Sequence, residues 1–151
     1  MPRIDDAPFD RPFSTPPLLR LWPRNMSTLS MTWDKFWATR QASNASRATH
    51  FVVGNEAADL DSVACAIAYA YFDMQHEWIP VIQARRCDLR LRRENVAHLE
   101  QCGIDMDTVC CLDDVPAMHR GMHVVLVDHN RATKAFESAT IDAIWDHHVD
   151  E

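Results

Sequence analysis

Glycine is scarce in this chain, with only three among 151 residues. They form no Gly-x-Gly-x-x-Gly pattern, the turn on which Rossmann folds hold a dinucleotide pyrophosphate, so a dinucleotide-binding domain is a weak interpretation. Long apolar segments are also lacking. The longest run, Val63 to Phe72, is about half of the ~20 residues that a membrane helix needs. The sequence therefore predicts no membrane partner.

Paired cysteine motifs are missing as well. The chain has five cysteines, an odd number, with no Cys-x-x-Cys spacing and no secretory signal before them. This usage favours a reducing compartment over a disulfide framework or a cysteine zinc site. We therefore expect a cytoplasmic protein.

Basic residues are too few to suggest non-specific nucleic-acid binding. The chain has 15 Lys and Arg against 22 Asp and Glu, a net charge of -7. The excess of acidic residues lies after residue 50, where the chain has eight basic and eighteen acidic residues. Such binding depends on neutralising phosphates, so we expect no nucleic-acid partner. A domain this acidic instead suggests a need for cations.

The first 30 residues differ from the rest in composition. Six of the eight prolines fall at or before Pro23. Because proline removes backbone donors and blocks helices, residues 1–30 are predicted to be a disordered leader and residues 31–151 a single domain. The leader carries Asp5, Asp6 and Asp10 among its arginines. Mitochondrial transit segments avoid acids, so such targeting is not favoured.

Short apolar segments alternate with helical patterns from residue 33 onward. Trp33, Phe36 and Trp37 have helical spacing, with Ser30 or Thr32 as a cap. Helices are predicted over Asp61–Met74 and Glu94–Cys102, and strands over His50–Val53, Trp78–Gln83, Val109–Leu112, His123–Val127 and Ala143–Trp145. This alternation is typical of an α/β fold with a parallel sheet and helices on both faces. The chain ends just after the last strand, so we expect the domain to be incomplete at its C-terminus.

Acidic clusters follow three of these strands. They are Gly54–Ser62, Asp128–Asn130 and Asp146–His148. Since the carboxyl ends of parallel strands share one edge, the three clusters are expected to meet there. Carboxylates and imidazoles without thiolate suit Mg²⁺, Mn²⁺ or Co²⁺, and two such ions can clamp a phosphoryl group. Taken singly, each cluster also fits a simpler interpretation, namely a helix cap, a turn and a solvated terminus.

Three ordered motifs carry a family resemblance. The segment Gly54–Ser62 reads Gly-Asn-Glu-Ala-Ala-Asp-Leu-Asp-Ser, Asp128 follows a strand, and residues 146–148 read Asp-His-His. Over residues 45–151 the chain resembles the DHH phosphoesterase superfamily, within its exopolyphosphatase, prune and family II pyrophosphatase branch. The similarity is greatest to eukaryotic cytosolic exopolyphosphatases. Family II pyrophosphatases have a histidine in place of Asn55, and prune-like proteins typically replace the last histidine, so intact His148 favours an exopolyphosphatase.

The resemblance implies a role for each motif residue. Its metal ligands would be Asp59, Asp61, Asp128 and His147, with Asp128 bridging two divalent ions, Mn²⁺ or Mg²⁺ with Co²⁺ as a further candidate. Catalysis would use Asp128, His148 and Asp146. Substrate would contact Asn55, His148, Arg86 and Arg92. The two arginines belong to a cluster that is equally explained as a solvated basic face.

The resemblance therefore predicts a hydrolase that releases terminal phosphate from inorganic polyphosphate or another small phosphoanhydride. Prune-like or pyrophosphatase-like activity stays open. In the family, a further metal-binding aspartate and a second, substrate-binding domain follow the triplet. Neither is present here, so the second alternative is an inactive, truncated module that binds metal or phosphate.

Overall fold

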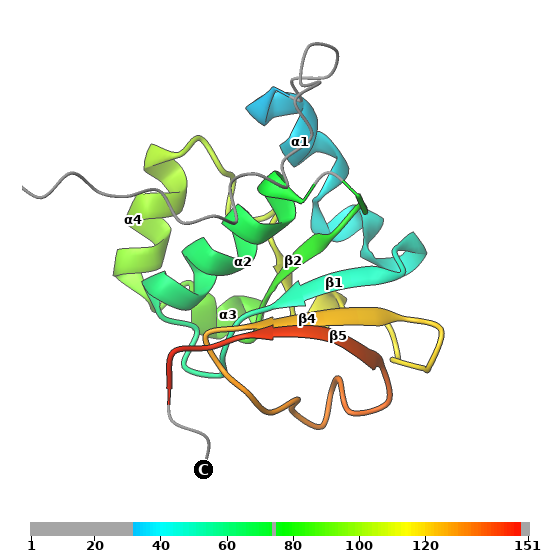
Figure 1. The fold of residues 1–151 in the computed structure, drawn as a ribbon. Coiled ribbons are helices and arrows are strands. Elements are labelled where there is room, and N and C mark those ends of the chain that lie inside the picture. Colours follow the sequence, from blue (N-terminus) through cyan, green and yellow to red (C-terminus); the bar gives the residue numbers. More distant parts are fainter. Residues whose placement is uncertain (1–31, 74, 149–151) are drawn as a thin grey trace, which may run out of the picture. The chain divides into compact units, whose positions relative to one another are not determined.

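Apolar segments form the five strands of one parallel sheet (Figure 1). A computed structural model describes residues 32–73 and 75–148. The strands are β1 (His50–Val53), β2 (Ile79–Ile82), β3 (Cys110–Cys111), β4 (His123–Val127) and β5 (Thr140–Trp145), in the order β3-β2-β1-β4-β5. Every neighbouring pair is parallel. The predicted α/β class with a Rossmann-like parallel sheet is confirmed.

Helices precede β1 and connect β1 to β2 and β2 to β3. They are α1 (Trp33–Thr39), α2 (Leu60–Phe72), α3 (Arg86–Leu89) and α4 (Arg93–Gln101), with 3-10 segments η2 (Ala42–Arg47) and η3 (Leu112–Asp114). Gly103 follows α4 with φ of 73°, a left-handed conformation that ends a helix and suits glycine. Thr32 occupies the N-cap position of α1, although its side chain makes no capping hydrogen bond. Ser30 and the proposed leader lie outside the described residues.

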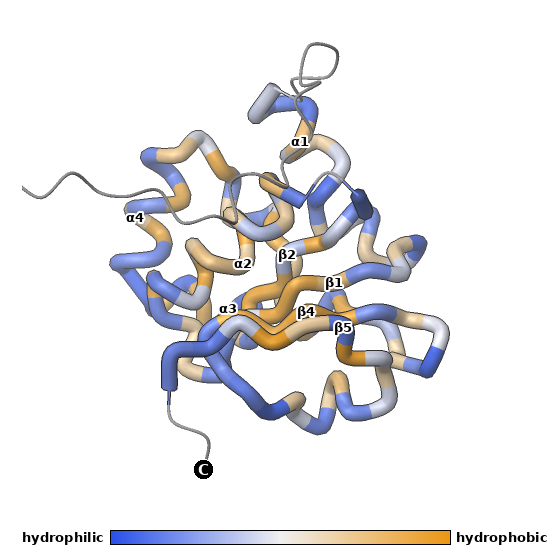
Figure 2. Tube along the Cα trace, viewed as in Figure 1, coloured by the Kyte–Doolittle hydropathy of each residue, from blue (hydrophilic) through white to orange (hydrophobic). Residues whose placement is uncertain are grey.

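Alternate residues of each strand enter two separate apolar cores. Val52 and Val125 face the core that contains Phe36 of α1, with side chains from α2 and α4. Phe51 and Val124 face the opposite core, where the cover comes from η2, η3 and the loop that carries Phe136. Figure 2 shows the resulting apolar strands at the centre of the molecule. Burying each such side chain contributes about 1.5–3 kcal/mol.

The edge strand β5 is the exception to this burial. A register shift opposite Val124 and Val125 interrupts its pairing with β4, and Trp145 is 64% exposed. At the other side of the sheet, Cys110 and Cys111 are fully buried, and burial raises the pKa of both thiols, that of Cys111 to about 11. No helix in the described part of the chain is long and apolar enough to cross a bilayer.

Candidate metal site

The three acidic clusters converge at the carboxyl edge of the sheet. Strands β1, β4 and β5 are neighbours, and each leads directly into one cluster. The backbone N–H of Asp128 donates to Trp145 O at 2.8 Å, and Asn55 Nδ2 donates to Asp128 Oδ2 at 2.7 Å. The β1 and β4 clusters therefore touch, and the start of the third cluster is tied to the second.

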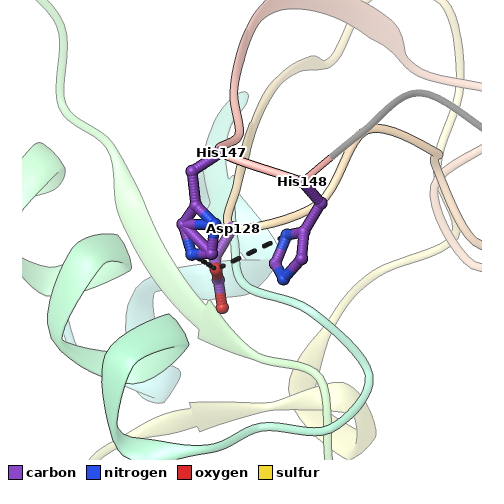
Figure 3. Close-up of side chains that lie close together, drawn as sticks. All are labelled: Asp128, His147 and His148. Atoms are coloured by element: carbon purple, nitrogen blue, oxygen red, sulfur yellow. Dashed lines mark ion pairs between the residues drawn. The ribbon is translucent and has the colours of Figure 1, made fainter.

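Asp128 is the centre of this arrangement. It adopts φ of 62°, a left-handed conformation in which residues other than glycine are uncommon, and its side chain is only 6% exposed. Asn55 occupies Oδ2, whereas Oδ1 lies 3.4 Å from His147 Nε2 and 4.0 Å from His148 Nδ1. Figure 3 shows both imidazoles beside this oxygen. Asn55 thus orients the carboxylate so that Oδ1 faces the histidines.

Asp128, His147 and His148 form one group that could hold a metal ion. Each offers a ligand atom, and these atoms all lie within 4.8 Å of one another. It is the one such group among residues 32–73 and 75–148. A carboxylate with two imidazoles suits a first-row divalent cation. Because both histidines are more than half exposed, an ion could reach them from solvent.

Asp146 forms hydrogen bonds with His148. Its Oδ1 lies 2.6 Å from His148 Nδ1 and also accepts from the His148 backbone N–H at 3.2 Å. This hydrogen bond raises the pKa of His148. Burial opposes ionisation of Asp146, but the hydrogen bonds from His148 outweigh it and hold the pKa of Asp146 below its usual range. Asp146 Oδ2 is buried without a hydrogen-bond partner, so the site has an unsatisfied anionic acceptor.

Asp59 and Asp61 lie at the start of α2, and their negative charges interact with the carboxylate of Asp128. Burial raises the pKa of Asp128, and the negative charges of Asp59 and Asp61 raise it further. Asp59 also caps α2, since its Oδ1 accepts from Ser62 N–H at 3.0 Å. Neither aspartate belongs to the 4.8 Å group around Asp128. The capping interpretation of Asp59 is therefore correct, and its metal-binding role stays a prediction.

The loop after β1 is fixed by a close contact that only glycine allows. A Cβ on Gly54 would lie 2.3 Å from Ser62 Oγ. That hydroxyl instead accepts from Asn55 N–H at 2.6 Å, and Asn55 Oδ1 accepts from Ala58 N–H at 2.9 Å. These bonds hold the Asn55 amide toward Asp128. The packing of this loop, which positions the Asn55 amide, therefore requires glycine at residue 54.

Gln83 is a site-edge residue that the sequence interpretation missed. It is buried at the carboxyl end of β2, where its Nε2 donates to Gly54 O and its Oε1 accepts from Thr133 Oγ1 at 2.7 Å. His129 Nε2 lies 3.4 Å from the same amide. The signal in the sequence was a polar residue directly after an apolar strand, at the same sheet edge as the acidic clusters.

The two predicted substrate arginines lie in α3 and directly before α4, in the segment that follows β2. Arg86 donates to Met106 O at 2.9 Å, to Val109 O at 2.8 Å and to Asp114 at 2.6 Å, so its guanidinium ties α3 to the segments around β3. Arg92 is the N-cap residue of α4. Neither arginine is among the described residues that line the two cavities beside Asp128. Their substrate-binding roles stay predictions.

Comparison with known proteins supports the resemblance drawn from the motifs. Exopolyphosphatase PRUNE1 of Bos taurus is 32% identical over a match of 124 residues, and the match covers 74% of this chain and 27% of that protein. Exopolyphosphatase PRUNE1 of Rattus norvegicus is 34% identical over a match of 117 residues that covers 70% of this chain and 26% of that protein. A Schizosaccharomyces pombe protein whose name also carries the word exopolyphosphatase is 38% identical over a match of 111 residues that covers 67% of this chain and 29% of that protein.

These matches cover most of the chain but a small part of each relative. The chain spans about a quarter of the length of the curated relatives it matches. No protein-family model matches the chain. The predicted resemblance to exopolyphosphatases is confirmed at the level of homology.

Proposed function

We propose that this homologue of exopolyphosphatases is a metal-dependent phosphoanhydride hydrolase that releases terminal phosphate from inorganic polyphosphate. The observation that carries the proposal is the group of Asp128, His147 and His148 at the carboxyl edge of the sheet. Its free cysteines, five in all, support a reducing compartment such as the cytoplasm.

The donor set fits a divalent cation. Asp59, Asp61 and Asp128 repel one another electrostatically, and the buried Asp146 Oδ2 has no partner in the protein. A cation relieves both penalties. Asp128 and His147 would hold it, with Asp59 and Asp61 completing two sites for Mn²⁺, Mg²⁺ or Co²⁺. Such ions supply charge neutralisation on a phosphoryl group and lower the pKa of water.

The residues of the chain then have distinct tasks. Asn55 holds Asp128 Oδ2, which leaves Oδ1 toward the cation. Asp146 raises the pKa of His148, and the His148 imidazole would donate to an anionic phosphate oxygen. The cavity lined by Asn55, Asp128, His129 and His148, with a volume of about 380 Å³, would receive the terminal phosphate.

The alternative is a non-catalytic module that binds metal or phosphate. The observation in its favour is that Asp59 and Asp61 do not belong to the group of ligand atoms around Asp128. Other phosphoanhydrides, such as pyrophosphate, would meet the same residues.

Phosphate release separates these proposals. The purified 151-residue chain is incubated with polyphosphate or pyrophosphate and Mn²⁺ or Mg²⁺, and orthophosphate is measured. We expect release from polyphosphate that is lost in Asp128→Asn and kept in Asp88→Asn, an exposed aspartate in α3. Saturable Mn²⁺ binding without release from either substrate would refute the hydrolase and favour the binding module. Faster release from pyrophosphate would refute the polyphosphate preference.

A further inference from the structure

A second cavity lies at the opposite, amino edge of the sheet. It has a volume of about 330 Å³ and includes the first residues of β1 and β2, His50 and Ile79. Its charged lining comes from Arg40, Arg47 and one carboxylate, Glu77, and its other polar groups are those of Thr39, Asn44, Thr49 and His50. Because the metal-site residues all follow strand ends, this cavity is separate from the site described above.

Arg40 is a buried cation with few partners. The side chain is only 3% exposed, and its Nε is buried without a hydrogen-bond partner. One terminal nitrogen, Nη1, donates to Thr39 Oγ1 at 2.8 Å, and the guanidinium carbon lies 5.7 Å from the centre of the Phe36 ring. A buried charge is costly unless it is paired, so this environment calls for an anion.

The carboxylate within reach does not meet that need. Glu77 Oε1 is 3.6 Å from Arg40 Nη1, beyond hydrogen-bond distance, and the Glu77 side chain is 82% exposed. A solvated pair of this kind contributes little. Arg47 adds a second positive charge to the lining, so the cavity keeps a net positive charge within an otherwise acidic domain.

We propose that this cavity is an anion site that takes a phosphate-sized oxyanion, either inorganic phosphate or the phosphate group of a small solute. The guanidinium groups of Arg40 and Arg47 suit the oxygens of a phosphate group, which arginine binds through paired N–H donors. The volume is at the small end of ligand pockets and exceeds that of bare phosphate. The proposal does not depend on hydrolase activity.

His50 provides a local reporter. Its ring stacks between His76 and His123, with centroid distances of 4.7 Å and 4.9 Å. Burial lowers the pKa of His50, and the two neighbouring imidazoles lower it further, while Asp142 and Asp73 oppose them. An anion in the cavity would favour the imidazolium, so phosphate should raise the pKa of His50.

The test is a phosphate titration of the full chain in excess chelator, which keeps the metal site empty of cations. Calorimetry gives the Kd, and proton NMR follows the His50 ring. We expect saturable binding with a Kd of about 1 mM. Arg47→Gln should weaken binding about tenfold. The matched control Arg120→Gln removes the same charge from an exposed arginine outside the cavity and should leave the Kd unchanged.

Two further variants test the buried cation and its carboxylate. Glu77→Gln removes a competing anion and should tighten phosphate binding. Arg40→Met keeps apolar bulk against Phe36 and removes the charge, so it should abolish binding without lowering the Tm in chelator. If Arg40→Met fails to fold, the Kd values of Arg47→Gln and Glu77→Gln test the proposal in its place.

Three results would overturn the proposal: absence of saturable binding, an equal effect of Arg47→Gln and Arg120→Gln on the Kd, or weaker phosphate binding by Glu77→Gln. Titration with glycerol phosphate separates the sources, since tighter binding than inorganic phosphate indicates a phosphorylated solute.

Discussion

Replacing Asp128 by asparagine should change stability in opposite directions with and without metal. In the metal-free protein, burial and the charges of Asp59 and Asp61 raise the pKa of Asp128. A carboxyl with a raised folded-state pKa binds its proton more tightly in the folded state, so stability falls as pH rises through that pKa. Asparagine carries no charge, and its amide oxygen can still accept from Asn55. In chelator at neutral pH, Asp128→Asn should therefore be at least as stable as the wild type.

With metal, the wild type should be the more stable of the two. At a Mn²⁺ concentration about 100 times the Kd, binding stabilises the native state by about 2.7 kcal/mol, which raises the Tm of a domain of this size by roughly 10 °C. Losing a group that merely orients a ligand weakens metal binding about 10–100-fold, so losing the ligand itself should cost at least about 100-fold. The variant then gains about 0.4 kcal/mol at the same Mn²⁺ concentration, or roughly 2 °C.

Thermal unfolding in chelator and in Mn²⁺ measures both effects. Asp88→Asn is the matched control, because it removes the same charge from an exposed position in α3 and should keep the full Mn²⁺ shift. An equal Mn²⁺ shift in the wild type and Asp128→Asn would refute the assignment of Asp128 as a ligand. A variant that is clearly less stable than the wild type in chelator would refute the electrostatic argument.

Three further predictions concern the loop after β1, the histidine pair and pH. Gly54→Ala places a Cβ against Ser62 Oγ and should lower the free energy of unfolding, measured in urea, by about 1–3 kcal/mol. The control Gly121→Ala meets only the flexible His119 side chain and should lower it much less. Equal losses in the two variants would contradict the steric argument. Asp146→Asn should lower the pKa of His148 toward its ordinary value in NMR titrations of the metal-free protein, and an unchanged pKa would show that Asp146 does not hold this imidazole. Mn²⁺ affinity, measured by calorimetry at each pH, should fall as the pH is lowered from 7 to 5. The reason is that Asp128, with its raised pKa, takes up a proton at a higher pH than an ordinary aspartate does. The contribution of Asp128 to this loss of affinity should be absent in Asp128→Asn.

The sheet could be predicted from the sequence wherever a strand was buried on both faces. The predicted bounds His50–Val53 and His123–Val127 match β1 and β4, since each is a continuous apolar run that begins at a histidine and is followed by Gly54 or Asp128. Strand β5 begins at Thr140, three residues before the prediction. It is an exposed edge strand, and the polar residues Thr140 and Asp142 at its start interrupt the apolar pattern. The segments η2, α3 and η3 were not predicted because they are too short to show helical periodicity.

The meeting of the acidic clusters followed from topology alone, whereas side-chain partnerships did not. Parallel strands that end in Asp128 and Asp146 must deliver both to one edge, as the structure has them. By contrast, the Asn55 bond to Asp128, the partners of Arg86 and the placement of Gln83 depend on packing between distant segments. A local sequence pattern does not encode such contacts.

Paramagnetic broadening by Mn²⁺ tests the central claim most directly. In an amide NMR spectrum of the isotopically labelled chain, substoichiometric Mn²⁺ should broaden the signals of Asp59, Asp61, Asp128 and His147 together and most strongly, and those of the amino edge, such as His50, much less. Broadening that spares Asp128, or that appears at the first of these clusters without the third, would contradict a single metal site assembled from three strand ends.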